Sequence, residues 1–367
     1  MKSSILSIAC IVLIISAIGI ACIYSATYQK EGWLWQDIYK RQILWALIGA
    51  LLFMLVSNVN YHRIWDWTYI LYIATVFFLL LVFLLGLARL GAQRWLRVAW
   101  FNFQPSEFAK LAVIIFLARY YSRKSSNDIR LCAQRYGIAS GIIIPFLVIC
   151  IPMGLIVEQP DLGSGLMLFA LFISMLLLSG VKFRYIFIFL FLAALPVPFL
   201  WHFLRDYQKE RLLVFLNPNI DPLGAGYTII QSKIAIGSGG LFGKGWLAGT
   251  QSQLRFLPES HTDFIFATFA EQWGFFGGVL LLLMYLAIIC QGFNIAQRTS
   301  DQFGRLLAAG ISLMLSIQIC VNIFMNMGLA PVVGLPLPLM SYGGSSMIVT
   351  LISIGILVNI DKTRTVF

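Results

Sequence analysis

Charged residues are scarce in this chain. Lys, Arg, Asp and Glu make up 11% of its 367 residues, whereas hydrophobic residues make up 60%. Soluble domains carry about 25% charged residues, so the composition excludes an ordinary soluble fold. It predicts an all-α polytopic membrane protein, because a helix satisfies its own backbone hydrogen bonds within hydrocarbon.

Acids, cysteines and histidines are also few. The chain has 15 Asp and Glu against 26 Lys and Arg, which gives a net charge of +11. In a membrane protein this excess fits a basic inner face near anionic lipid, and we expect no nucleic-acid partner. The six cysteines show no CxxC spacing, so neither a disulfide framework nor a zinc site is predicted. The three histidines show no triad or metal spacing.

Long apolar runs are abundant, and each is long enough to cross about 30 Å of hydrocarbon as a helix. The predicted spans are 5–26, 42–57, 67–88, 105–120, 136–156, 162–180, 185–202, 263–295, 305–327 and 341–360. Ten transmembrane helices place both termini on one side of the membrane. Lys and Arg are more frequent in the inner segments when the N-terminus is inside, so we expect cytoplasmic termini. The first run is interpreted as an uncleaved span.

The chain is predicted to be a single transmembrane domain, 1–367, with one long extracytoplasmic loop, 203–262, between the seventh and eighth spans. Polar residues also gather at the outer ends of the spans. They occur at the start of the fourth span, in the turn between the fifth and sixth, and at the starts of the eighth and tenth. This one-sided distribution predicts a common polar cleft that faces outward.

Two of these groups of polar residues contain charged side chains. Glu107 and Lys110 are three residues apart on one helical face, so they can form an ion pair, either purely structural or also shaping the cleft. Arg94 precedes them as an interfacial anchor or a contact to an anion. Glu158 and Asp161 flank a short turn, in which Asp161 caps the next helix or both acids hold a divalent cation.

The long loop is rich in glycine and lysine. Its pattern fails the Walker sequence, because Ser238 replaces the first glycine and Gly245 replaces the final Ser or Thr. A looser anion cradle that uses Lys233, Lys244 and Arg255 is the functional interpretation. The alternative is a lid that covers the membrane surface.

The segment 334–346 contains two prolines before Ser341 and cannot be one regular helix. Non-helical backbone at membrane depth must be buried in protein or line a wet cavity. Close helix packing is the simpler explanation, and a contribution to the polar cleft is the functional one.

Asp263 opens the eighth apolar run. It is interpreted either as an acid in the first helical turn after a Thr262 cap, or as a catalytic carboxylate. A strip of small residues, Ala267, Ala270, Gly274 and Gly278, is expected to descend from it at helical spacing, flanked by Glu271. Such a strip packs against a neighbouring helix or leaves a groove for a lipid chain.

Segments 91–95, 103–107, 159–163, 221–249, 250–259 and 341–345 together resemble the SEDS family (shape, elongation, division and sporulation) over essentially the whole chain. Segments 221–227 and 250–259 are more similar to its rod-shape members than to its division members. The resemblance implies a peptidoglycan glycosyltransferase of the bacterial inner membrane. Such an enzyme polymerises lipid II, an undecaprenyl-pyrophosphate-linked disaccharide peptide, into β-1,4-linked glycan strands at the outer face for cell elongation and rod shape.

The resemblance also implies partners and site residues. The partners are a class B penicillin-binding protein transpeptidase, other membrane proteins of the elongation complex, and membrane lipid. Asp263 carries over as the catalytic residue, and Glu107 and Lys110 as residues important for activity. The substrate-binding side chains are expected to be Arg94, Glu107, Lys110, Lys233, Lys244, Arg255 and Ser341.

The chemistry requires a base near an acceptor hydroxyl, which Asp263 can supply, and stabilisation of the departing pyrophosphate. The pyrophosphate can be stabilised by Arg94, Lys110, Lys233, Lys244 or Arg255, or by a divalent cation such as Mg or Mn held by outer acids; no other cofactor is expected. An α-linked donor and a β-linked product imply a single inversion. Two alternatives stay open: a lipid II flippase, and a scaffold without catalytic activity.

Overall fold

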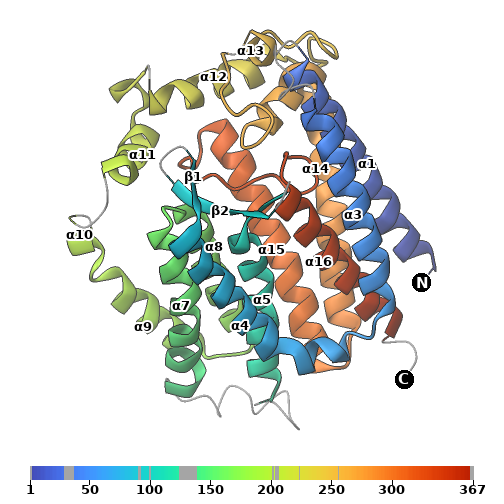
Figure 1. Ribbon diagram of the computed structural model, residues 1–367, viewed down its shortest axis with the longest axis vertical. Coiled ribbons are helices and arrows are strands. Elements are labelled where there is room, and N and C mark those ends of the chain that lie inside the picture. Colours follow the sequence, from blue (N-terminus) through green and yellow to red (C-terminus); the bar gives the residue numbers. More distant parts are fainter. Residues whose placement is uncertain are drawn as a thin grey trace.

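The protein is a bundle of long helices. The computed structural model describes residues 2–28, 37–89, 92–98, 101–123, 139–200, 202, 206–222, 224–254 and 256–363. Helices α12 (Ala225–Ser238) and α13 (Thr250–Gln253) lie at one end of the bundle, and the C-terminal end of α16 (Gly344–Thr363) lies at the opposite end (Figure 1). The elements are α1 (Lys2–Thr27), α3 (Ile38–Asn58), α4 (His62–Leu85), β1 (Leu87–Arg89), β2 (Ala92–Val98), β3 (Phe101–Phe103), α5 (Pro105–Arg123), η1 (Ala139–Ile143), α7 (Ile144–Glu158), α8 (Leu162–Leu178), α9 (Phe183–Ala194), α10 (Val197–Leu200), α11 (Asp206–Leu216), η3 (Pro218–Ile220), α12 (Ala225–Ser238), α13 (Thr250–Gln253), α14 (Ile265–Arg298), α15 (Gln302–Met327) and α16 (Gly344–Thr363).

Seven of the described helices are long and apolar enough to cross a membrane: α1, α3, α4, α14, α15, α16, and the helix that continues from η1 into α7. Three other predicted spans are also helical, but α8 and α9 are shorter, with 17 and 12 residues, and α5 carries charged side chains. The protein is therefore a multi-pass membrane protein. A total of ten membrane crossings stays a prediction.

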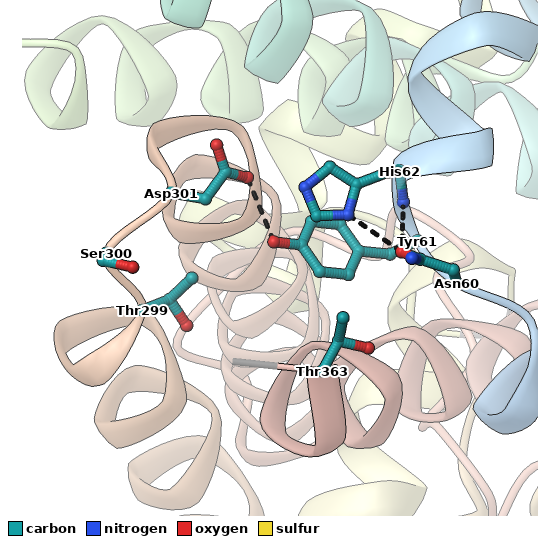
Figure 2. A pocket seen from close by; sticks show the side chains of 7 residues that line it. All are labelled: Asn60, Tyr61, His62, Thr299, Ser300, Asp301 and Thr363. Carbon is teal, nitrogen blue, oxygen red and sulfur yellow. Dashed lines mark hydrogen bonds between the residues drawn. The ribbon is translucent and has the colours of Figure 1, made fainter. Parts of the chain in front are cut away.

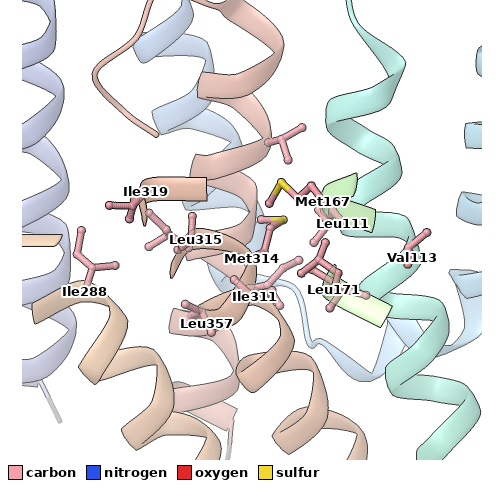
Figure 3. Close-up of a cluster of buried hydrophobic side chains, with 14 of the residues drawn as sticks. Leu111, Val113, Met167, Leu171, Ile288, Ile311, Met314, Leu315, Ile319 and Leu357 are labelled. Atoms are coloured by element: carbon pink, nitrogen blue, oxygen red, sulfur yellow. The ribbon is translucent and has the colours of Figure 1, made fainter. Parts of the chain in front are cut away.

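Helix α15 lies at the centre of the bundle. Within their apolar spans, 72% of the α15 residues and 89% of the α16 residues are buried in protein, against 22% in α3 and α4. Figure 3 shows the α15 side chains Ile311, Met314, Leu315 and Ile319, which pack among apolar side chains from neighbouring helices. The outer helices therefore face lipid, and the central ones can hold polar groups away from it.

A small antiparallel sheet departs from the all-α prediction. Strand β2 pairs with β1 on one side and with β3 on the other, in the connection between α4 and α5. The chain leaves α4 at Gly86, which has an extended conformation. Outside the helices, backbone amides and carbonyls still need partners, and a local hairpin provides them.

The 203–262 segment is largely helical where it is described, and includes α11, η3, α12 and α13. Helix α12 packs on α14 and α15, and the Ser232 hydroxyl donates to the Asn326 carbonyl oxygen at 2.7 Å. The segment is therefore attached to the central helices.

Helix α14 is broken at Gly274, where φ is 67° and ψ is −164°. The glycine-rich turn 239–249, between α12 and α13, forms backbone hydrogen bonds with α14 at this break. Lys244 N donates to the Glu271 carbonyl oxygen at 3.0 Å, and Phe275 N donates to the Gly240 carbonyl oxygen at 2.9 Å. The predicted strip of small residues on one continuous helix is therefore wrong. The turn supplies the backbone partners that the broken helix lacks.

Gly274→Ala is expected to destabilise the protein. The backbone conformation at Gly274 is one that only glycine adopts readily, and strain of this kind costs about 1–3 kcal/mol. A Cβ atom there would also lie 2.3 Å from Gly243 N. Thermal unfolding in detergent should show a lower midpoint for Gly274→Ala. Gly278→Ala is the control, because a Cβ at that helical position meets no atom within 4 Å. Equal midpoints for the two variants would contradict this account of the break.

Candidate active site

Asp263 lies in the turn just before α14. The helix begins at Ile265, and its N-cap residue, Phe264, makes no side-chain cap. The Thr262 hydroxyl donates to Glu259 Oε2 at 3.0 Å, so the expected Thr262 cap on the helix is wrong. Asp263 is partly exposed, whereas the residues that follow it are buried. Asp263 therefore lies at the rim of the bundle, next to its buried interior.

Two asparagines of α15 hold the backbone at Asp263. Asn322 Nδ2 and Asn326 Nδ2 each donate to the Asp263 carbonyl oxygen at 3.0 Å. Both asparagines are fully buried. A carbonyl that accepts two such bonds is fixed in position, which limits the movement of its own side chain.

The 334–343 segment packs against the same turn. It is non-helical, as its prolines predict, and α16 begins only at Gly344. A Cβ atom built on Gly334 would lie 3.6 Å from Asp263 Oδ2, so this backbone passes beside the carboxylate. The Ser341 hydroxyl donates to the Thr262 carbonyl oxygen at 2.6 Å and accepts from Leu337 N at 2.8 Å. Ser341 therefore joins the two segments.

A second polar group connects β2 to the starts of α5 and α8. Asp161 accepts from Ser164 N at 3.2 Å, so its predicted role as the cap of α8 is confirmed. The Ser106 hydroxyl donates to Asp161 Oδ2 at 3.3 Å. Arg94 donates to the Pro160 carbonyl oxygen, and its Nη1 lies 3.9 Å from Asp161 Oδ1. Asp161 thus faces an arginine and a hydroxyl group, whereas Glu158 is exposed.

The predicted ion pair in α5 is confirmed. Lys110 Nζ lies 2.7 Å from Glu107 Oε1, and the two side chains are 1% and 3% exposed. The chain just before this helix reaches the tenth predicted span, since Gln104 N donates to the Ser345 hydroxyl at 3.0 Å. The polar groups at the starts of the fourth, sixth, eighth and tenth predicted spans are therefore linked, by hydrogen bonds or by short runs of chain. The linking residues are Asp161, Ser106, Gln104, Ser345, Ser341 and Thr262.

Burial raises the pKa of the Asp263 carboxyl from 3.8 to about 6. The negative charge of Glu259 raises this pKa further, whereas Arg211 and Arg94 lower it and Asp161 raises it slightly. The site thus contains an acid that is mostly ionised at neutral pH yet basic enough to accept a proton. Two guanidinium groups act on the same carboxylate.

The sequence matches the FtsW/RodA/SpoVE family of cell cycle proteins over residues 5–366. The chain belongs to this family. Peptidoglycan glycosyltransferase MrdB of Escherichia coli (strain K12) is 43% identical over 343 residues, which are 93% of this chain and 89% of that protein. Peptidoglycan glycosyltransferase RodA of Treponema pallidum (strain Nichols) is 34% identical over 424 residues, covering 96% of each chain.

Solved structures show the same fold. One chain comes from a study of the structural coordination of polymerization and crosslinking by a peptidoglycan synthase complex. It is 34% identical, covers 97% of both chains and superposes with a TM-score of 0.81. The crystal structure of the rod shape determining protein RodA of Thermus thermophilus is 28% identical, covers 97% of this chain and 96% of that one, and has a TM-score of 0.70.

Of the loop cations predicted to bind substrate, Lys244 and Lys233 lie in different surroundings in this FtsW/RodA/SpoVE chain. Lys244 Nζ lies 2.8 Å from Oε1 of Glu271, a fully buried carboxylate. Lys233 is exposed on α12, and its side chain lies over Gly328 at the end of α15. Arg255 lies outside the described residues. For Lys244, the pairing with Glu271 gives a structural role that the sequence did not indicate.

Arg211 is a site residue that the sequence analysis missed. It lies on α11, and its Nη1 donates to the Val332 carbonyl oxygen at 3.3 Å, next to the segment that passes Asp263. No local motif marks it. The two asparagines were also missed, although Gln318, Asn322 and Asn326 recur every four residues in an apolar helix, which is a readable signal.

A cavity of about 450 Å³ lies beyond the other end of α14 from Asp263. Figure 2 shows Tyr61 and Asp301 joined by a hydrogen bond in it, with His62 and Asn60 alongside. This cavity is not part of the candidate site. In the part of the chain that the structure describes, no three His, Cys, Asp or Glu side chains are grouped as metal ligands.

Proposed function

We propose that this chain is a peptidoglycan glycosyltransferase that polymerises lipid II into β-1,4-linked glycan strands, with Asp263 as the general base. The observation that carries the proposal is the setting of Asp263. Asp263 is partly exposed as a residue, its backbone is held by two buried asparagines, and burial raises the pKa of its carboxyl to about 6, which suits proton transfer near neutral pH.

In the proposed reaction, Asp263 accepts the proton of the acceptor sugar hydroxyl. The hydroxyl oxygen forms a bond to the anomeric carbon of the donor, while the bond from that carbon to the pyrophosphate breaks. The electron pair leaves with undecaprenyl pyrophosphate, and the configuration inverts once. No covalent enzyme intermediate is needed.

Cations near Asp263 stabilise the leaving group in this proposal. Arg94 and Arg211 both act electrostatically on the Asp263 carboxylate, so an anion bound beside it would face them too. Lys110 is buried and paired with Glu107, so we assign this pair to shaping the site. Ser341 contributes by joining the 334–343 segment to the Asp263 turn.

We also propose the setting of the enzyme. Ten helices cross the bacterial inner membrane, both termini are cytoplasmic, and the site opens on the periplasmic side. The partner is a class B penicillin-binding protein that crosslinks the strands, which fits the similarity to a chain of a peptidoglycan synthase complex. The similarity to the rod shape determining protein RodA of Thermus thermophilus supports our proposal of a role in rod shape and cell elongation.

The test is polymerisation in detergent. Purified full-length protein with its partner is incubated with labelled lipid II, and products are separated by length. Glycan strands longer than the substrate are expected. A flippase moves lipid II between leaflets and leaves it unpolymerised, so an unchanged substrate would overturn the proposal.

The rate of polymerisation should depend on pH with an acid limb near 6. A base works only when deprotonated, so kcat/KM should fall as the pH drops below the pKa of Asp263, about 6. Glu259→Gln removes a charge that raises this pKa, so the limb should shift to lower pH. Arg211→Gln removes a charge that lowers it, so the limb should shift to higher pH. Shifts in the opposite directions would show that another group titrates.

A further inference from the structure

Three amide side chains repeat every four residues along α15. Gln318, Asn322 and Asn326 are 2%, 0% and 0% exposed. Buried amides are costly in an apolar helix unless their hydrogen bonds are satisfied. Residues four apart lie on one helical face, so all three side chains can contact the same neighbouring segments of the chain.

The hydrogen bonds of this amide row go to two segments that are distant in sequence. Asn322 Nδ2 donates both to the Asp263 carbonyl oxygen at 3.0 Å and to the Leu335 carbonyl oxygen at 2.7 Å. Gln318 Nε2 donates to the Pro336 carbonyl oxygen at 3.1 Å. A single side chain, that of Asn322, thus bonds both walls of the proposed site.

Asn326 adds a second bond at the same place. Its Nδ2 donates to the Asp263 carbonyl oxygen at 3.0 Å, and its Oδ1 accepts from Ala267 N at 3.1 Å, in the first turn of α14. It also bonds Asn322, with Nδ2 donating to the Asn322 carbonyl oxygen at 2.8 Å. The two asparagines therefore act as one unit that fixes the Asp263 turn to α15.

We infer that Asn322 and Asn326 are positioning residues, which set where the Asp263 carboxylate lies relative to the 334–336 backbone and the bound sugar. This inference rests on the proposed function. The geometry favours positioning over general stability, because the row bonds the residue proposed as base and the segment that passes its carboxylate. A displacement of about 1 Å at a reacting group can cost about 100-fold in rate.

The test measures kcat and KM for lipid II with purified full-length protein and its partner. Asn322→Leu removes the donor to both walls while keeping a similar volume. We expect kcat to fall about 10- to 100-fold with KM changed less than about twofold. Ser316→Ala is the matched control on α15, because among the described residues the Ser316 hydroxyl donates to the carbonyl oxygen of Ser312 in its own helix and to no other segment.

Asn326→Asp is the second variant and keeps the shape of the side chain. It retains the acceptor for Ala267 N but places a carboxylate at the Asp263 turn, where Glu259, Asp161, Arg94 and Arg211 already act on the base. The acid limb of kcat/KM should therefore shift to higher pH, which loss of fold stability alone does not produce. This variant carries the test if Asn322→Leu does not fold.

The outcomes separate the two proposals. If Asp263→Asn loses activity while Asn322→Leu keeps its kcat within about twofold, or while Asn326→Asp leaves the acid limb in place, the positioning inference is overturned and the base assignment stands. If Asp263→Asn polymerises lipid II at the wild-type rate, the proposed base fails, whatever the asparagine variants do.

Discussion

Asp263→Asn is expected to reduce the polymerisation rate about 10²- to 10⁴-fold, the range that positioned acid or base groups contribute. The amide keeps the size and the hydrogen-bonding capacity of the side chain but cannot accept the proton. The backbone bonds from Asn322 and Asn326 reach the main-chain oxygen, so they remain in the variant. Activity is therefore expected to fall without a loss of fold.

The stability of Asp263→Asn at neutral pH should be equal to or higher than that of the wild type, although its activity falls. A carboxyl whose pKa is raised on folding, from 3.8 to about 6, binds a proton more tightly in the folded state, so its contribution to stability falls as the pH rises through this interval. At neutral pH the ionised, partly buried carboxylate is therefore unfavourable. Asp263→Asn should unfold at an equal or higher temperature than the wild type.

The control for this pair of measurements is Asp37→Asn. Asp37 is 42% exposed and pairs with Lys40 at 2.9 Å on the surface, so its loss should change the unfolding free energy by less than about 1 kcal/mol and leave the rate unchanged. Wild-type polymerisation by Asp263→Asn would remove this residue from its role. A sharply lower unfolding temperature would instead mean that lost activity reflects lost structure.

Lys110→Met is expected to have the largest effect on stability, about 3–5 kcal/mol. Lys110 and Glu107 are almost fully buried, and removing the ammonium leaves a carboxylate without its countercharge. The double variant Glu107→Gln with Lys110→Met removes both charges, so it should be more stable than Lys110→Met alone. Replacement of a whole buried pair is often close to neutral.

The chain supplies a matched control. Lys40 and Asp37 have the same three-residue spacing, and their charged atoms lie 2.9 Å apart, but the side chains are 63% and 42% exposed. Lys40→Met should therefore lower the unfolding free energy far less than Lys110→Met, because water screens the exposed pair. Denaturation in a fixed detergent compares the variants. If Lys110→Met and Lys40→Met lost the same free energy of unfolding, burial would not determine the strength of the Glu107–Lys110 pair.

Features with short-range causes could be predicted from the sequence. The apolar runs predicted helices, and all ten predicted segments are helical over most of their described length. The spacing of Glu107 and Lys110 predicted their pairing, and the prolines before Ser341 predicted the break before α16. Each prediction depends on helix geometry and on neighbours within a few residues.

Features with distant partners could not be predicted in this way. Lys244 was assigned to an anion because its carboxylate partner, Glu271, lies 27 residues away, in helix α14. The Gly274 break depends on a turn that enters from the 203–262 segment. Arg211 has no motif, and only the packing of α11 near the 334–343 segment brings it to Asp263.

The sequence by itself determined that this is a helical membrane protein, and it marked Asp263, because hydrophobic runs and an outlying acid are local properties of the chain. Only the tertiary structure decided what surrounds that acid. Asn322, Asn326 and Arg211 are distant from it in the sequence, with separations of 59 residues for Asn322 and 63 for Asn326. The strength and direction of such contacts depend on how helices pack, which no local pattern of residues encodes.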